Sequence, residues 1–320
     1  LAALLEASAQ AKRRVALGEA KHFAREARRI AETRVEESSA VEALGEAFFY
    51  GYEGDSAWSH LRDAVDLLLA SDHPNPGDVA RICARALEMP VRWPGAMVSP
   101  PPEATVAHYL RTGMSHVVEA GGVDEVRLLT LNAFWQHAFP ISPDDPEAPV
   151  IGPDEALHSG ELAVEAARRL GRADLESAAL DGVSACFIPQ GAYREALAVD
   201  ERRLELIDDL HDLWEIGDTF AMNSWTRYHI GHYREALKYA NEGFSRTVGE
   251  APSLALHCLR WRAQAQFRLG NWSAVVEDYR LARRLLEERN DVPPHYVSPI
   301  YAAAALVHEI REERADADAI

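Results

Sequence analysis

The chain has 320 residues, 48% of them hydrophobic and 26% charged, and this composition excludes a collagen, a disulfide scaffold and wholesale disorder. Acidic residues outnumber basic ones by 51 to 33, so the formal charge is −18 and the surface should repel a nucleic-acid backbone. The three cysteines are too widely spaced to suggest a disulfide framework, and no apolar run is long enough to span a bilayer. We therefore expect a reduced, cytoplasmic, soluble protein that binds neither nucleic acid nor membrane.

The spacing of apolar residues predicts helices along almost the whole chain, because these residues recur three and four positions apart and never alternate as in a half-buried strand. Residues 1–34 already have this pattern, which is typical of a segment cut from a longer protein, although a removed tag or leader would give the same start. A capping box is expected at Ser39 and Glu42. Helix-breaking glycines and prolines occur about every twenty residues and predict about fifteen helices. They include Gly18, Gly54, Gly171, Gly191, Gly231 and Gly270.

Two proline-rich segments interrupt this helical pattern, at residues 90–102 and 139–153. Each holds five prolines and cannot be helical throughout, because proline lacks the backbone N–H that a helix interior uses. We favour an extended strap packed across neighbouring helices for both segments. Loops of this length can also be functional or mobile, and that alternative stays open.

Three segments, at 190–206, 230–246 and 269–285, share one internal repeat. Each begins with a glycine suited to a tight turn between antiparallel helices. An aromatic residue follows two positions later, expected to wedge into the helix pair, and a small residue lies three positions beyond it. Another small residue lies midway along the preceding helix, where it lets two helices approach closely. The four sets are Gly191, Gly231 and Gly270; Tyr193, Tyr233 and Trp272; Ala196, Ala236 and Val275; and Ser184, Ser224 and Ala263.

This pattern resembles the tetratricopeptide repeat (TPR), most clearly over residues 175–289, with a weaker copy starting at Gly54. The glycines lie 40 and 39 residues apart, a longer period than the family's 34, and the proline that closes each repeat of the family is missing. The resemblance implies an all-α fold, a right-handed superhelix of about seven antiparallel helix pairs in one continuous α-solenoid. Within it, residues 1–150 are expected to form an irregular N-terminal lobe and residues 151–320 the TPR-like repeats.

The degenerate form of the repeats resembles the C-terminal repeat regions of large bacterial signalling ATPases, including LuxR-type activators and ATPase-coupled class III adenylate or guanylate cyclases. That resemblance implies a non-catalytic interaction or sensor module, the regulatory part of a longer protein. The chain itself has no G-x-x-x-x-G-K phosphate loop and no segment that could form a cyclase domain, so we expect no enzyme activity from it. A stand-alone protein-binding scaffold, a small-molecule receptor and an enzyme with its site in the superhelix cavity are the alternatives.

No cofactor, metal site or catalytic residue is expected. His229 and His232 are three residues apart and could share a metal ion, but Gly231 breaks the helix between them and no further ligand lies at a matching offset. A capping or solvated role is therefore the better interpretation of this pair. No nucleophile and base, and no pair of carboxylates, has a usable spacing.

The first helices of TPR pairs line the concave face of the superhelix, and the family pattern places a partner groove there. One repeat contributes Asp218, Ala221, Trp225, Tyr228 and His229 to this groove, the next His257, Arg260, Gln264, Phe267 and Arg268, and the preceding one Asp181, Ala185 and Ile188. Aromatic anchors beside Arg and His donors suit a protein or peptide segment, which could belong to the rest of the parent chain, or a small anionic ligand. Alternatively, the aromatic residues are only core between repeats, and the charges line an empty, wet groove.

Overall fold

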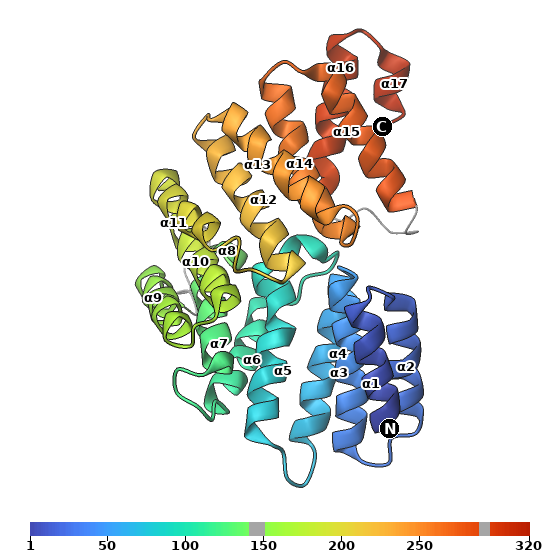
Figure 1. The fold of residues 1–320 in the computed structure, drawn as a ribbon, viewed down its shortest axis with the longest axis vertical. Helices are drawn as coiled ribbons and strands as arrows, with labels where there is room; N and C mark the ends of the chain where they lie inside the picture. Colours follow the sequence, from blue (N-terminus) through green and yellow to red (C-terminus); the bar gives the residue numbers. More distant parts are fainter. Residues whose placement is uncertain (141–150, 288–294) are drawn as a thin grey trace. The chain divides into compact units, whose positions relative to one another are not determined.

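The computed structural model describes residues 1–140, 151–287 and 295–320, and every regular element in these ranges is helical (Figure 1). The predicted all-α, TPR-like solenoid of paired helices is therefore confirmed. The helices belong to two compact units, Leu1–Pro189 and Gln190–Ile320, which are described separately below. No helix in the described ranges is long and apolar enough to cross a membrane.

In its described residues, 1–140 and 151–189, the first unit holds ten α-helices and two short helical turns. They are α1 (Ala2–Arg13), α2 (Leu17–Arg29), α3 (Arg34–Tyr50), α4 (Gly54–Leu69), α5 (Pro76–Leu87), η1 (Glu88–Arg92), η2 (Pro94–Ala96), α6 (Glu103–Ser115), α7 (Val123–Ala133), α8 (Trp135–Ala138), α9 (Pro153–Arg169) and α10 (Ala173–Phe187). Consecutive helices pack on each other, most extensively α1 on α2, α3 on α4 and α9 on α10. The core of the unit lies between these neighbours.

The second unit holds seven α-helices and one short turn within the described ranges. They are α11 (Tyr193–Glu205), α12 (Leu213–His229), α13 (Tyr233–Thr247), α14 (Pro252–Arg268), α15 (Trp272–Glu287), η3 (His295–Val297), α16 (Ser298–Ile310) and α17 (Arg314–Asp318). The helix α12 packs on α13, α13 on α14, and α12 also contacts α14 directly. First helices of successive pairs thus lie side by side, as they do in a helical-repeat array.

The repeat pattern predicts the turns of these pairs correctly. Gly231 and Gly270 adopt positive φ angles of 87° and 77°, which glycine tolerates without steric cost. The small residues are fully buried at the contact, and Ser224 Oγ donates a hydrogen bond to the carbonyl of Ala236 at 2.9 Å. A larger residue at either position would separate α12 from α13.

The first pair, α1 and α2, repeats this contact although its sequence lacks the glycine. Ser8 Oγ donates to the carbonyl of Ala20 at 2.9 Å, with the same twelve-residue separation as Ser224 and Ala236, and Val15 takes the positive φ of 58°. Residues 1–34 are therefore two helices, and the expected breaker Gly18 lies inside α2. Without a glycine at the turn, the pattern could not mark this pair.

Two local predictions near α3 and α4 are wrong. The capping box is formed by Thr33 and Glu36, whereas Ser39 lies inside α3 and donates to the carbonyl of Val35 at 3.0 Å. The break before α4 is made by Tyr52, which has a φ of 61°, and Gly54 already begins the helix. The true capping residue lies six residues before the expected one, and the true break lies two residues before Gly54.

The proline-rich segment 90–102 packs across the first unit, as predicted, but part of it is helical. It continues α5 through η1 and η2, and Val91, Trp93 and Met97 are buried. The carboxylate of Asp55, at the start of α4, accepts hydrogen bonds from the backbone N–H groups of Val98 and Ser99, at 2.8 and 2.9 Å. Most of the second such segment, 139–153, lies outside the described residues.

Candidate ligand-binding face in the second unit

Eight side chains form one face across α12 and α14. We call this set the α12–α14 face; its members are Trp225, Tyr228 and His229 of α12 and His257, Arg260, Trp261, Gln264 and Arg268 of α14. Each of the α14 residues lies three or four positions from another member of the set, so they share one side of the helix. Asp212 caps α12 by accepting a hydrogen bond from the N–H of Trp214 at 2.9 Å, and Pro252 occupies the first turn of α14.

The centre of the face is the indole of Trp261, which is only 3% exposed and belongs to the core. Three rings of α12 surround it. The ring centroid of Trp225 lies 6.3 Å away, that of Tyr228 5.8 Å and that of His229 5.8 Å. Trp225 and Tyr228 are half-buried and His229 is exposed, so the cluster reaches from the core to the surface.

Tyr193, at the start of α11, extends this aromatic cluster. Its ring stacks on His229 with centroids 5.3 Å apart and meets Trp225 edge-on at 5.8 Å. The repeat pattern expects Tyr193 to be a wedge inside its own helix pair. The aromatic rings that Tyr193 contacts in the second unit, however, belong to α12. Tyr193 therefore borders the α12–α14 face.

Two arginines lie over aromatic rings of the face. The guanidinium of Arg260 is 4.4 Å from the ring centroid of Trp261, and Nε of Arg268 donates to the hydroxyl of Tyr228 at 3.0 Å. A cation over an aromatic ring is held by the ring's negative face, and this contact fixes the position of an otherwise flexible side chain.

Both histidines of the face favour the neutral form. Burial lowers the pKa of His257 to about 4, with the charge of Arg260 acting in the same direction and that of Asp218 opposing it. Burial also lowers the pKa of His229, where the hydrogen bond to the carbonyl of Trp225 opposes the shift and Arg260 adds to it. The positive charge of Arg260 thus contributes to lowering the pKa of one histidine on each of the two helices.

Asp218, which the sequence places in the groove, is buried beneath the face and only 2% exposed. It forms an ion pair with Arg203 of α11 at 2.6 Å, and Glu215 lies 3.8 Å from the same guanidinium. Arg203 is itself fully buried. This carboxylate therefore joins α11 to α12 and neutralises a buried cation, in keeping with the rule that buried charges are paired.

Three nitrogen atoms of the face are buried and have no hydrogen-bond partner among the described residues: Nδ1 of His257, Nε1 of Trp261 and Nε2 of Gln264. They lie on one side of α14, at positions i, i+4 and i+7. Such groups normally find a partner, because burying a polar group without one costs free energy. The sequence analysis missed Trp261, although helical spacing from His257 and Gln264 could have indicated it.

The remaining groove candidates have packing roles or belong to the first unit. Ala221 is fully buried in the cluster around Trp261, and Phe267 is half-buried. In the first unit, Asp181 forms a buried ion pair with Arg92 at 3.1 Å. Ala185 and Ile188 follow Asp181 near the end of α10 and are buried and half-buried respectively.

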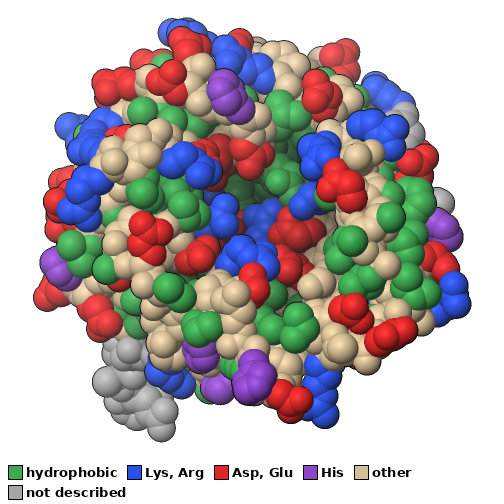
Figure 2. All heavy atoms as spheres, turned by 60° about the horizontal axis from the view of Figure 1, so that its bottom comes forward, with side chains coloured by type: hydrophobic (Ala, Val, Ile, Leu, Met, Phe, Trp, Pro, Cys, Tyr) green, Lys and Arg blue, Asp and Glu red, His purple; other side chains and the backbone are tan. Residues whose placement is uncertain are grey.

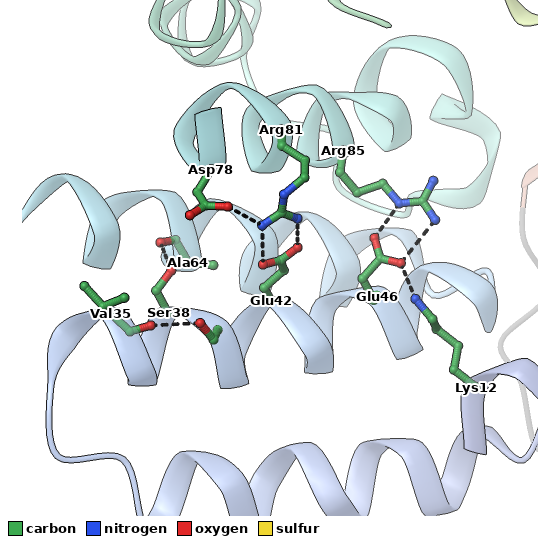
Figure 3. Close-up of polar contacts among 10 residues, drawn as sticks. Lys12, Val35, Ser38, Glu42, Glu46, Ala64, Asp78, Arg81 and Arg85 are labelled. Carbon is green, nitrogen blue, oxygen red and sulfur yellow. Dashed lines mark hydrogen bonds and ion pairs between the residues drawn. The ribbon is translucent and has the colours of Figure 1, made fainter. Parts of the chain in front are cut away.

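A second concentration of polar side chains, in the first unit, joins α1, α3 and α5 (Figure 3). We call it the first-unit ion-pair network; it consists of Lys12, Glu42, Glu46, Asp78, Arg81 and Arg85. Glu46 accepts from Lys12 Nζ and from Arg85 Nε, each at 2.6 Å, while Arg81 pairs with Glu42. Figure 2 likewise shows acidic and basic side chains intermixed over one face of the molecule.

One group in the described part of the chain has the composition of a metal site: His308, Glu313 and Asp316, whose ligand atoms lie within 4.8 Å of one another. Nδ1 of His308 is 2.6 Å from Glu313. The group spans the turn between α16 and α17 in the way that Arg227 and Glu235 span the turn between α12 and α13, at 3.3 Å.

No protein-family model matches the chain, and no curated protein sequence matches it. Solved structures do match. A Rap protein complexed with competence and sporulation factor has a TM-score of 0.57 and 13% identity, over 98% of each chain. NprR in complex with its cognate peptide NprX has a TM-score of 0.53 and 13% identity, over 99% of this chain and 86% of that one.

A third match is the signal transduction ATPase with numerous domains, carrying a TPR sensor, from Pyrococcus horikoshii. Its TM-score is 0.54 at 11% identity, and the match covers 91% of this chain but 40% of that protein. At such identities the comparison shows the fold alone. The chain therefore has the fold of TPR-like helical-repeat proteins.

Proposed function

We propose that this chain is a non-catalytic TPR-like interaction or sensor module that binds a protein or peptide segment on the α12–α14 face. The observation that carries the proposal is the aromatic cluster, which runs from the buried Trp261 to the exposed His229 with Arg260 over it. Tryptophan, tyrosine and arginine grouped around a desolvated centre are the residues that dominate the binding energy of protein interfaces. The complex of NprR with its cognate peptide and that of a Rap protein with competence and sporulation factor, both of the same fold, support this choice of ligand.

We propose further that the module is the regulatory C-terminal part of a larger bacterial signalling protein, such as a nucleotidyl cyclase or an ATPase-type transcriptional regulator. The TPR sensor of the Pyrococcus horikoshii ATPase, part of a longer chain, supports this placement. The gene tests it. A reading frame that continues upstream of the Leu1 codon into an ATPase or cyclase module would support the proposal, and a start codon directly before Leu1 would contradict it.

The α12–α14 face also supports a second function, that of a receptor for a small anionic molecule. Its arginines and its buried nitrogen atoms without a hydrogen-bond partner in the described residues could bind an anion that is not part of a peptide. A peptide is favoured because the cluster presents several rings from two helices, a larger surface than a small anion would use. Isothermal titration with small carboxylates alone distinguishes the two functions.

Affinity capture tests the interaction function directly. The wild-type chain, Arg260→Glu and the control Arg284→Glu are used as baits, and covalent cross-links from captured proteins are mapped on the bait. Arg284 is exposed on α15, so the control reverses a charge in the same unit away from the face. We expect cross-links to α12 and α14 that Arg260→Glu loses and Arg284→Glu keeps. Equal capture by all three baits, or cross-links elsewhere, would contradict the proposal.

A further inference from the structure

Three side chains that commonly bind metal ions meet where the chain turns from α16 into α17. His308 lies in the last turn of α16, Glu313 directly precedes α17 and Asp316 lies within it. Their ligand atoms all lie within 4.8 Å of one another, and Nδ1 of His308 is 2.6 Å from Oε2 of Glu313. The ligands of a tetrahedral zinc ion, with bonds of about 2.0–2.1 Å, are roughly 3.4 Å apart, so small side-chain rotations would seat an ion here.

The fold already holds these three side chains together. Glu312 adopts a φ of 63° and reverses the chain, and the N–H of Glu313 donates a hydrogen bond to the carbonyl of His308 at 2.9 Å. The side chain of His308 is only 10% exposed, so its ring has little freedom left to lose on binding. The carboxylate of Asp316 makes no hydrogen bond or ion pair with another described residue, so no contact within that part of the chain competes for it.

The charge around the turn favours a cation as the ligand. Residues 309–318 hold five acidic side chains and only two basic ones. One of the two basic side chains, Arg311, donates a hydrogen bond to Oγ of Ser273 on α15 at 2.9 Å. A local surplus of negative charge raises the concentration of cations near it. The acidic side chains are Glu309, Glu312, Glu313, Asp316 and Asp318, and the second basic one is Arg314.

We infer that His308, Glu313 and Asp316 form a binding site for a divalent transition-metal ion, Zn²⁺. One imidazole nitrogen with two carboxylates is a ligand set that suits Zn²⁺, whereas Mg²⁺ and Ca²⁺ take oxygen ligands. Three protein ligands leave the fourth position of a tetrahedral ion to water. The sequence offered no signal of this group, because a spacing of five residues from His308 to Glu313 does not place two side chains on one face of a continuous helix. The inference is independent of the proposed peptide-binding function.

A bound ion would attach α17 to α16. The helix α17 has five residues and none of them is buried, so few apolar contacts hold it in place. A helix of this length is not stable by itself in water. An ion that takes one ligand from the last turn of α16 and another from α17 joins the two helices directly. Zinc should therefore order α17 and complete the last helix pair of the second unit.

Titration of the full chain with ZnCl₂, in competition with a chromophoric zinc chelator, measures the affinity. Asp316→Asn removes a ligand charge at an exposed position, so the variant should fold, and Asp318→Asn removes the same charge two positions further along α17 as a control. We expect one zinc ion per chain, bound at least about tenfold more weakly by Asp316→Asn and equally well by Asp318→Asn. His308→Gln should also lose the site, whereas His295→Gln, at an exposed histidine outside it, should keep it.

Hydrogen–deuterium exchange gives an independent measurement at the site itself. Added ZnCl₂ should slow exchange of the α17 amides in the wild type and in Asp318→Asn, and should leave exchange unchanged in Asp316→Asn. Equal zinc affinity of these two variants, Mg²⁺ binding as tight as that of Zn²⁺, or exchange in wild-type α17 that zinc does not slow would each overturn the inference. Peptide capture is measured without added zinc, so failure of the metal site leaves the proposed function standing.

Discussion

The first helices of the two units carry polar side chains of very different kinds. In the first unit, Glu46 of α3 lies between Lys12 and Arg85, and each charge has an opposite charge within 2.6 Å (Figure 3). In the second unit, one side of α14 carries buried nitrogen atoms that have no hydrogen-bond partner in the described residues, such as Nε1 of Trp261. A saturated polar network stabilises its own fold, whereas an unsaturated one lowers stability until something binds. This difference is the basis for our proposal that the first set is structural and that the second binds a ligand.

The strongest test of this comparison is Trp261→Ala. The indole is buried at the centre of its cluster, so truncation should leave a cavity and cost about 3–5 kcal/mol of unfolding free energy. Binding should be lost as well, because the rings of α12 lose their support. Chemical denaturation followed by circular dichroism measures the loss. The control Trp225→Ala, at a half-buried position, should cost about 1 kcal/mol while it also weakens binding.

The two tryptophans thus separate core from face. If Trp225→Ala destabilises the chain as much as Trp261→Ala and leaves binding unchanged, the aromatic rings of α12 are only packing between repeats. The α12–α14 face would then not be a binding surface.

Glu46→Gln tests the structural role of the first-unit ion-pair network. Burial opposes ionisation of Glu46, but Arg85 and Lys12 outweigh it and lower its pKa from 4.5 to about 2. A carboxylate with a lowered pKa in the folded state contributes stability above its unfolded pKa, and that contribution disappears as the pH falls from 4.5 towards 2. The free energy of unfolding of the wild type should therefore exceed that of Glu46→Gln by about 3 kcal/mol at pH 7.

Urea denaturation at pH 7 and at pH 3 checks this prediction, because the difference in unfolding free energy between the wild type and the variant should be smaller at pH 3. The exposed carboxylate of Glu19 provides the control, and Glu19→Gln should change stability little at either pH. A gap that is equally wide at pH 3 would mean that the charge of Glu46 does not stabilise the first unit. Peptide binding should be unaffected by Glu46→Gln.

Ala236→Leu tests the close contact that both units share. Ala236 is fully buried where α13 meets α12, and its carbonyl accepts the hydrogen bond of Ser224. A larger side chain should force the helices apart and cost about 1–3 kcal/mol. Ala198→Leu, at an exposed position of α11, should be neutral in the same denaturation experiment. Equal stability of both variants would invalidate the alignment of the repeats.

Much of the fold could be predicted from the sequence because the turns and close contacts use residues of distinctive size. Gly231 marks its turn since few other residues adopt a φ of 87°, and Ser224 marks the contact since a larger residue would not fit. The turn of the first pair escaped prediction because Val15 takes the same conformation without the usual residue. A β-branched residue at positive φ gives no signal in a sequence.

The candidate site was less predictable, for two physical reasons. The predicted groove residues were chosen by offsets along single helices. Such offsets cannot show that Asp218 forms a buried ion pair with Arg203 of the preceding helix. The same offsets passed over Trp261, because a tryptophan in the middle of a helix is typical of core packing. Its proposed role at the face depends on an indole N–H that has no hydrogen-bond partner among the described residues, and only the three-dimensional structure reveals that.

The smallest expected effect is the pH dependence of peptide binding. Burial lowers the pKa of His229, whose neighbours are the rings of Tyr193, Trp225, Tyr228 and Trp261 and the charge of Arg260. An anionic group of a bound peptide should raise that pKa. The extra affinity is then fully present below the pKa of the free protein and is lost as the pH rises through the pKa of the complex. Affinity for an acidic peptide should therefore increase about two- to fivefold from pH 7.5 to pH 5.5. His229→Gln should abolish this dependence, and a wild-type profile as flat as that of the variant would place the anionic group of the peptide away from His229.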